Sequence, residues 1–364
     1  MTGTTHRRTS EPADRPTDPA RAPRMADVAR LAGVSPQTVS RVINGHPNVS
    51  AEVRERVQQA VVALRYRRNP AARSLATRRT MSLGVVTYGL AQHGPSVALT
   101  GIADAARQAG YTTNLVGLVE LDRAALRRAL GHLMDDYVDG IVLLAPVDDA
   151  VHAVAGLHTE VPLVIFEPGA PPRPAGFAAH EVLGARLATQ HLLDIGHETV
   201  LHLSGPAGWL ATTARIRGWR EALSDAGRHA PAPVATSWTA ASGFEAVDRV
   251  IASGSTAVFA ANDQTALGLI RGLTEHGVRV PEDVSVVGFD DFPESEYFSP
   301  PLTTVRVDFA ALGRLAVRKL LALIEGEEVS DPLTPPTLVV RASTGTPPAT
   351  SSTPPIPTTP KENP

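Results

Sequence analysis

Four polar residues near the N-terminus have side chains that can hydrogen-bond to DNA bases. The stretch 27–44 carries, among apolar residues, Gln37, Thr38, Ser40 and Arg41. Gln37 and Arg41 are four positions apart, so in a helix they lie on one side, with the two hydroxyl residues beside them. Amide, hydroxyl and guanidinium groups bind base edges and phosphates. The pattern indicates sequence-specific DNA binding, and the alternative is a solvated polar face of a small helical hairpin.

Two adjacent carboxylates, Asp290 and Asp291, end an apolar run and could hold hydroxyl groups, bind a metal or act as an acid/base pair. Neighbouring side chains of an extended chain point to opposite faces, which argues against the pair and the metal. The histidines do not support a metal site either, because His191, His197 and His202 lack the i,i+4 pairing of a metal-binding helix. No nucleophile elbow or Ser-His-Asp arrangement is visible. The sequence predicts no catalytic residue, no metal and no cofactor.

Three further residues allow both a ligand-binding and a structural interpretation. Trp238 precedes a predicted helix and could stack on the apolar face of a sugar, or it could be a partly buried packing residue. Asn262 follows a predicted strand and could contact a ligand, although capping the next helix is what asparagine does best. Arg215 lies near the start of a predicted helix, where an arginine is more often solvated. The residues alone leave these alternatives open.

The polar stretch near the N-terminus lies on the second of two short predicted helices. Gly33 occupies the turn between them, Ser35 is a good N-cap, and Pro36 suits the first helical position, where a missing N–H costs nothing. Apolar residues at helical spacing predict the buried faces, namely Val28, Leu31 and Ala32, then Val39, Val42 and Ile43. Ser50 can cap a third helix whose apolar stripe completes a helix-turn-helix unit, Val53, Val57, Ala60, Val61 and Leu64.

A basic segment, residues 65–79, follows this unit. Asn69 and Pro70 are again a cap and a first helical residue, and they open a helix of about two turns. So short a helix is marginal in water, and we expect it to order only against DNA or a second copy of the chain. Leu75 would then be free to insert into a minor groove. The alternative is a basic linker.

Residues 24–80 resemble the DNA-binding headpiece and hinge of the LacI/GalR family of bacterial transcription repressors. The resemblance covers nearly the whole chain, with later stretches similar to sugar-responsive members at 90–96, 238–244, 261–268 and 300–309. In that family the recognition helix enters the major groove and the hinge leucine enters the minor groove. The resemblance therefore assigns DNA contacts to Ser35, Gln37, Thr38, Ser40, Arg41, Asn44, Asn69 and Leu75. Pro36 stands where a sugar-responsive member of the family has a tyrosine, which should change the preferred bases.

The resemblance also implies a ligand site and a response to the ligand. It assigns effector contacts to Gln92, Pro95, Glu167, Arg215, Trp238, Asn262, Asp290 and Phe309. Because the polar residues and the tryptophan of the family's sugar site are present, the resemblance implies a ligand with a galactose-like ring. The wall of the site differs from that of a sugar-responsive member at Gln92, Glu167, Ala178 and Val307, which favours a larger or more polar substituent on the ring. The expected function is repression that a sugar inducer relieves by releasing the protein from a palindromic operator. The alternatives are a family member that answers to a purine or a phosphoprotein, and a sugar-binding transport receptor.

The composition of the chain agrees with a globular DNA-binding protein. Its 364 residues are 43% apolar, enough for two or three domains with sizeable cores. It has no cysteine and no apolar run of membrane-spanning length, so we expect a cytoplasmic location and no membrane partner. Residues 1–80 hold 15 Arg and no Lys against six acidic residues, a net charge of +9, whereas the remainder holds 19 basic and 31 acidic residues, a net charge of −12. The basic charge coincides with the predicted DNA-binding unit.

From residue 81 onward, short β-rich runs alternate with amphipathic helices, which predicts an α/β fold of two doubly wound lobes. The resemblance makes this core periplasmic-binding-protein-like. The expected strands are 82–88, 112–118, 140–144, 163–166, 199–203, 257–260 and 284–289. The expected helices are 97–109, 122–134, 148–157, 184–193, 213–226, 244–252, 264–276 and 309–324, the last crossing back to the first lobe. Ligands of such sheets bind at the carboxyl ends of the strands, here between the lobes.

The predicted domains follow the chain in order. They are a disordered extension (1–23), a headpiece (24–68), a hinge helix and linker (69–80), a two-lobed effector-binding and dimerisation core (81–344) and a disordered Pro/Thr-rich tail (345–364). The tail is too rich in proline to form the leucine-heptad helix by which a family member makes tetramers. We therefore expect a homodimer that binds operator DNA with one headpiece per half-site.

Overall fold

The chain forms two compact units, residues 1–78 and 79–364. The structure, a computed structural model, describes residues 23–67, 79–120, 122–148, 150, 159–166, 177–327 and 334–348. Several predictions fall outside this description: the N-terminal extension, the hinge residues Asn69 and Leu75, the effector residue Glu167, the side chain of Ala178, most of the helix expected over 148–157 and the end of the tail. No helix in the described ranges combines the length and the apolar character that crossing a membrane requires.

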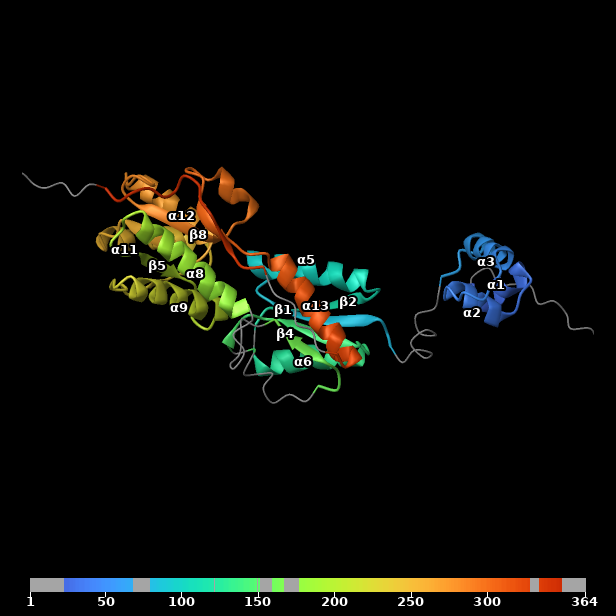
Figure 1. Ribbon diagram of the computed structural model, residues 1–364. Helices are drawn as coiled ribbons and strands as arrows, with labels where there is room; N and C mark the ends of the chain where they lie inside the picture. The colour runs from blue at the N-terminus through green and yellow to red at the C-terminus, as the bar shows by residue number, and fades with distance from the viewer. Residues whose placement is uncertain are drawn as a thin grey trace, which may run out of the picture. The chain divides into compact units, whose positions relative to one another are not determined.

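The first unit consists of three helices, α1 (Met25–Ala32), α2 (Pro36–Ile43) and α3 (Ala51–Ala63). They are the blue helices of Figure 1. Gly33 ends α1 in the left-handed conformation, with φ of 66°. Ser35 Oγ then accepts a hydrogen bond from Thr38 N at 3.1 Å and caps α2, and Ser50 caps α3 in the same way. The structure thus has the turn and both caps that the sequence predicts.

Three fully buried valines, one from each helix, form the centre of the first unit: Val28, Val39 and Val57. Leu31, expected on the buried face of α1, is instead 57% exposed, and Ala29 is buried. Helix α1 contacts both α2 and α3, and the stripe that faces them runs at positions i, i+3, i+4 and i+7 from Met25. This stripe omits position 31, so the prediction for Leu31 is wrong.

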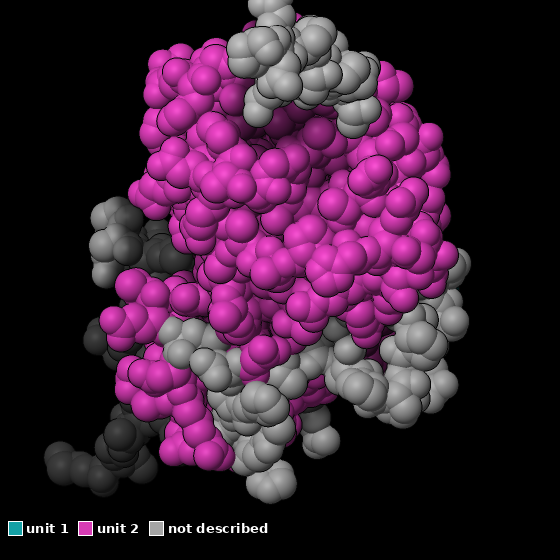
Figure 2. Space-filling view, turned by 90° about the vertical axis from the view of Figure 1, so that its left-hand side faces the viewer, with its two compact units in different colours: residues 1–78 teal, residues 79–364 magenta. Residues whose placement is uncertain are grey.

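The second unit, magenta in Figure 2, contains two sheets. The first sheet has the strand order β2-β1-β3-β4 and is parallel throughout. Its strands are β1 (Ser82–Tyr88), β2 (Thr112–Leu118), β3 (Gly140–Leu144) and β4 (Leu163–Ile165). Apolar residues of the sheet pack against α5 (His93–Gln108) and α13 (Phe309–Glu325) in one cluster, and against α6 (Arg123–Asp135) in another.

The second sheet has the order β10-β9-β8-β7-β5-β6 and is parallel except for β10, which pairs antiparallel with β9. Its strands are β5 (Leu201–Ser204), β6 (Val234–Ala235), β7 (Ala257–Ala260), β8 (Ser285–Asp290), β9 (Thr303–Arg306) and β10 (Thr337–Val339). Its helices are α8 (Phe177–Asp194), α9 (Leu210–Asp225), α10 (Ala240–Glu245), α11 (Val247–Ala252), α12 (Asp263–Glu275) and the 3-10 helix η1 (Pro293–Tyr297). The two doubly wound lobes that the sequence predicts are present.

Helix α13 follows β9 of the second sheet but packs against α5 of the first lobe, as predicted (Figure 1). Two glycines permit this contact. A Cβ on Gly101 would lie 2.1 Å from Ala310 O, and a Cβ on Gly313 would lie 2.1 Å from Ala98 O. Because no side chain separates the helices at these points, the chain can return to the first lobe in close contact.

Some elements differ from the sequence prediction. Helix α5 begins at His93 rather than at residue 97, and the helix expected over 244–252 is two helices, α10 and α11, that begin at Ala240. Strands β6, β9 and β10 were not predicted, since each has only two to four residues and lies in a stretch rich in proline or threonine. Gly345, assigned to the tail, donates its N–H to Ser285 Oγ at 3.0 Å, so the packed chain continues past residue 344.

Candidate functional site

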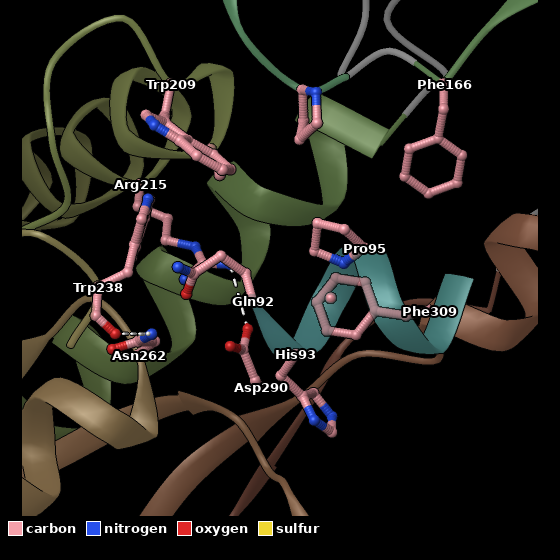
Figure 3. A pocket seen from close by; sticks show the side chains of 13 residues that line it. Gln92, His93, Pro95, Phe166, Trp209, Arg215, Trp238, Asn262, Asp290 and Phe309 are labelled. Carbon is pink, nitrogen blue, oxygen red and sulfur yellow. Dashed lines mark hydrogen bonds and ion pairs between the residues drawn. The ribbon is translucent and has the colours of Figure 1, made fainter. Parts of the chain in front are cut away.

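A cavity lies in the second unit at the carboxyl ends of its parallel strands (Figure 3). Its empty volume is about 500 Å³, which includes space open to solvent. Its lining comes from segments that follow β1, β3, β4, β5, β6, β7, β8 and β9, and therefore from both lobes. The lining residues are Gln92, His93, Gly94, Pro95, Pro146, Phe166, Trp209, Ala211, Arg215, Trp238, Asn262, Asp290 and Phe309. Every described residue to which the sequence analysis assigned an effector contact is among them.

Arg215, on α9, holds the polar side of the cavity together and is only 4% exposed. Its Nε donates to Glu181 Oε2 at 2.5 Å and its Nη2 donates to Asp290 Oδ1 at 3.2 Å. Its Nη1 donates to the carbonyl oxygen of Ala261. The guanidinium carbon also lies 3.7 Å from the centroid of the Phe289 ring. The general expectation of a solvated arginine is therefore wrong, because three hydrogen bonds and an aromatic face replace water.

The charges around Arg215 shift its pKa and that of Asp290. Burial raises the pKa of Asp290 to about 8, although the Arg215 guanidinium acts in the opposite direction. Burial disfavours the charge on Arg215, but the carboxylates of Glu181 and Asp290 outweigh it and raise the pKa of the guanidinium. The Arg215 guanidinium is thus paired with two carboxyl groups, those of Glu181 and Asp290. At neutral pH Asp290 can hold a proton or offer its oxygens to a ligand hydroxyl.

Asn262 and Trp238 form the next part of the wall. Asn262 Oδ1 accepts a hydrogen bond from Thr265 N at 2.9 Å and caps α12, which confirms the capping alternative. Its Nδ2 donates to the carbonyl oxygen of Trp238 at 3.0 Å, so the same residue also holds the cavity wall. Trp238 has a positive φ of 64° and is 5% exposed. Its indole packs edge-on against Trp209, with ring centroids 5.8 Å apart. Trp238 is both a packing residue and part of the lining.

Aromatic and proline side chains occupy another part of the lining, contributed largely by the first lobe and α13 (Figure 3). His93 lies edge-on to Phe309, with centroids 6.1 Å apart, and 5.4 Å from Phe292. Burial lowers the pKa of His93, so its ring is neutral at pH 7. Gln92 is adjacent, and its Oε1 is buried without a hydrogen-bond partner among the described residues. A ligand donor could satisfy this oxygen.

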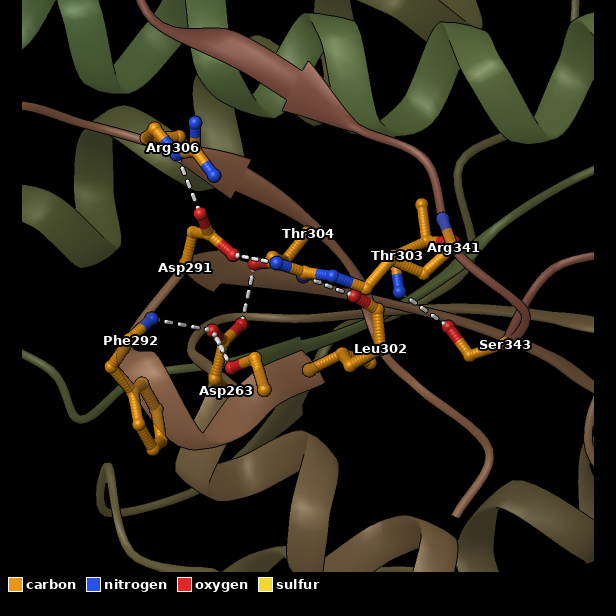
Figure 4. Close-up of polar contacts among 10 residues, drawn as sticks. Asp263, Asp291, Phe292, Leu302, Thr303, Thr304, Arg306, Arg341 and Ser343 are labelled. Atoms are coloured by element: carbon orange, nitrogen blue, oxygen red, sulfur yellow. Dashed lines mark hydrogen bonds and ion pairs between the residues drawn. The ribbon is translucent and has the colours of Figure 1, made fainter. Parts of the chain in front are cut away.

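Asp291, unlike Asp290, does not line the cavity. It accepts hydrogen bonds from Arg306 Nε at 2.6 Å and Arg341 Nη2 at 2.7 Å (Figure 4). Beside it, Asp263 is fully buried and accepts from Ser295 and Thr304. Burial raises the pKa of Asp263 to about 7. These contacts fix the loop that follows β8 and so fix the direction of Asp290.

Sequence reasoning missed several residues of this site. Trp209 precedes a helix as Trp238 does, and that shared context could have indicated it. Phe166 is the last residue of the predicted strand 163–166, and His93 lies in the stretch 90–96, in which the resemblance assigned only Gln92 and Pro95. Glu181 left no usable signal, because a glutamate in a helix is ordinarily solvated. Val307, expected in the wall, is 8% exposed and packs in the core instead.

The first unit presents the predicted DNA-contacting residues on α2 and at its ends. Gln37, Arg41 and Asn44 are exposed, whereas Thr38 and Ser40 are partly buried. Asn44 Nδ2 donates to Ser40 Oγ at 3.3 Å, and Ser35 Oγ lies 2.9 Å from Thr38 Oγ1. The buried Val39 and Val42 hold the other side of α2 against the unit. The polar side of α2 is therefore accessible and can bind in a groove of DNA.

Comparisons with known proteins match both units. The description "Bacterial regulatory proteins, lacI family" matches residues 24–69, and "Periplasmic binding protein-like domain" matches residues 189–344. The chain is 38% identical to the lactose operon repressor of Escherichia coli (strain K12), over 90% of this chain and 92% of that protein. It is 34% identical to the HTH-type transcriptional repressor PurR of Vibrio parahaemolyticus, over 83% and 92% respectively. The solved structure of the Lac repressor dimer bound to operator and the anti-inducer ONPF aligns with a TM-score of 0.78 and 36% identity, covering 89% of this chain and all of that chain.

Proposed function

The chain belongs to the lacI family of bacterial regulatory proteins, and on that premise we propose that it represses sugar-utilisation genes until a galactoside or galactose-containing oligosaccharide releases it from its operator. It is a DNA-binding transcriptional repressor with a sugar-binding core. The proposal further states that the inducer is a galactoside, that the operator is palindromic and that the protein is a cytoplasmic homodimer.

The composition of the cavity is the observation that carries the inducer proposal. A sugar ring presents hydroxyl groups around its edge and C–H groups on its faces, so it needs hydrogen-bonding groups and aromatic surfaces in one enclosed site. The cavity supplies Arg215, Asn262 and Asp290 on its polar side. Trp238 and Phe309 supply aromatic surface. Buried acceptors that face a hydroxyl-rich ligand make such binding selective, since an unmatched polar group is costly.

The exposed polar side of α2 supports the DNA-binding part of the proposal. Gln37 and Arg41 project from a helix whose other side is buried, which is the arrangement of a recognition helix in a major groove. Residues 1–80 carry a net charge of +9, so phosphate contacts should make affinity fall steeply with salt. The hinge residues Asn69 and Leu75 lie outside the described residues, and their proposed DNA contacts rest on the family pattern.

Release from DNA would follow from the two-lobed lining of the cavity. Gln92 and Pro95 come from the first lobe, whereas Asn262 and Asp290 come from the second, so a ligand that touches both favours one arrangement of the lobes. A coupling of about 1–3 kcal/mol between sugar and operator would lower operator affinity roughly 5- to 150-fold. A purine or phosphoprotein response is the second candidate, since the repressor PurR is also among the relatives of this chain. A transport receptor is disfavoured because it has no use for the helix-turn-helix unit.

Titration calorimetry on the full chain tests the inducer. Methyl β-D-galactopyranoside and lactose should bind the wild type, whereas Trp238→Ala should lose the heat of binding because it loses the aromatic surface. Asp248→Asn is a matched surface control, since its side chain is 89% exposed and lies outside the cavity. Tight binding of a nucleobase without any binding of galactosides would show that the inducer proposal is wrong.

Operator release and assembly need separate measurements. An operator selected from random DNA should show an inverted repeat, and fluorescence anisotropy should show that the bound sugar weakens its binding. Sugar that strengthens operator binding would mean co-repression instead. Sedimentation velocity should give a dimer, and a tetramer that survives deletion of residues 345–364 would contradict it.

A further inference from the structure

Glu181, on α8, is a fully buried carboxylate that does not line the cavity. Its Oε2 accepts a hydrogen bond from Arg215 Nε at 2.5 Å. Its Oε1 is buried and has no hydrogen-bond partner among the described residues. Burying a carboxylate is costly unless a cation compensates it, and half of this one's hydrogen-bonding capacity is unused. Because burying the Glu181 carboxylate costs free energy of folding, we infer that its role is not to stabilise the fold.

The contacts of Arg215 show what Glu181 does to the cavity. A guanidinium binds a carboxylate or phosphate through two parallel N–H groups, either at its Nε–Nη2 edge or at its Nη1–Nη2 end. Here Glu181 takes Nε, the carbonyl oxygen of Ala261 takes Nη1, and Asp290 takes an N–H of Nη2. The paired Nε–Nη2 edge is therefore interrupted, and an incoming anion finds only one remaining N–H on each of Nη1 and Nη2.

The charges around the cavity lead to the same conclusion. Arg215 contributes one positive charge, and Glu181 cancels it across a short ion pair. Asp290 adds a further carboxyl group. His93 and His202 supply no compensating charge, because burial lowers the pKa of His93 and lowers that of His202 to about 3. An anionic ligand would thus enter a buried site without a spare cation, whereas a neutral hydroxyl could donate to Asp290 and accept from an amide such as that of Asn262.

We propose that Glu181 determines the ligand class of the cavity by neutralising Arg215 and occupying its Nε, so that the cavity accepts uncharged sugars and excludes anionic ones such as uronates and sugar phosphates. This inference rests on the proposed function, that the cavity binds a sugar. Glu181 is a specificity-determining residue that acts through Arg215 and does not touch the ligand. Without the negative charge of Glu181, Arg215 would carry an uncompensated positive charge at the wall of the cavity, which favours an anion.

Calorimetry on the full-length wild type and Glu181→Gln tests this, with methyl β-D-galactopyranoside, D-galacturonate and inorganic phosphate as probes. The wild type should bind the neutral galactoside and should bind galacturonate at least tenfold more weakly. Glu181→Gln should bind galacturonate and phosphate roughly 10- to 100-fold more tightly than the wild type, which is the range of one charge-assisted hydrogen bond. Glu221→Gln is the matched control, because Glu221 pairs with Arg186 and Arg217 near the surface and should leave all three affinities unchanged.

The outcomes separate this inference from the proposed function. If the wild type binds the galactoside but Glu181→Gln gains no affinity for either anion, the role of Glu181 is refuted and the sugar site stands. If the wild type binds no galactoside but Glu181→Gln gains anion affinity, the exclusion of anions stands and the galactoside proposal fails. Wild-type affinity for galacturonate equal to that for the galactoside refutes the inference without any variant. Should Glu181→Gln not fold by circular dichroism, Glu181→Met removes the same charge and must show the same gain.

Discussion

Replacing Asp290 by asparagine should weaken galactoside binding roughly 5- to 150-fold while leaving operator binding unchanged. Asp290 is 7% exposed, lines the cavity and accepts a hydrogen bond from Arg215 Nη2 at 3.2 Å. Asparagine preserves the shape of the side chain but replaces the carboxyl oxygen that faces a sugar hydroxyl by an NH2 group, which cannot accept a hydrogen bond. Leaving a buried hydrogen-bonding group without its partner costs about 1–3 kcal/mol, and this range converts to the stated loss of affinity.

The assay is titration calorimetry with methyl β-D-galactopyranoside, with operator affinity measured in parallel by fluorescence anisotropy. One control makes the result specific. Asp248→Asn changes an exposed carboxylate outside the cavity and should keep sugar affinity within about twofold. Unchanged sugar affinity in Asp290→Asn, or an equal loss in Asp248→Asn, would refute the reasoning.

Three further predictions concern DNA, pH and packing. Arg41→Ala should weaken binding to the selected operator by about 1–3 kcal/mol and relax its base preference, and an equal loss on random DNA in anisotropy would contradict this. Because burial raises the pKa of Asp290 from 3.8 to about 8, the folded protein holds a proton that the unfolded chain releases, so stability falls as pH rises between these values. Urea unfolding should show a smaller fall in Asp290→Asn than in the wild type, and identical pH profiles would refute this. Gly313→Leu should lower the free energy of unfolding of the second unit, measured in urea, by about 1–3 kcal/mol, because its Cβ would lie 2.1 Å from Ala98 O. Gly131→Leu is the control and should not lower it, because the space around its Cβ is open.

The first unit shows how much local sequence can determine. The turn at Gly33, the cap by Ser35 and the proline that begins α2 act within a few residues of one another, so their effect does not depend on the rest of the chain. The error at Leu31 has the opposite origin. Its burial depends on where α2 and α3 lie around α1, and helical spacing alone does not give that direction.

For the second unit, sequence by itself determined the alternation of strands and helices, and with it the edge at which a ligand site must form. That is why Asp290, at the end of a predicted strand, could be singled out from the residues alone, whereas Gln92 and Asn262 were assigned to the ligand by the family resemblance. Only the tertiary structure decided the charge of the site. Glu181 and Arg215 are 34 positions apart, and their ion pair exists because α8 and α9 pack together and exclude water from both side chains. Burial and pairing across such a distance are properties of the assembled fold, and they turn an ordinary glutamate into a residue that can set the ligand class.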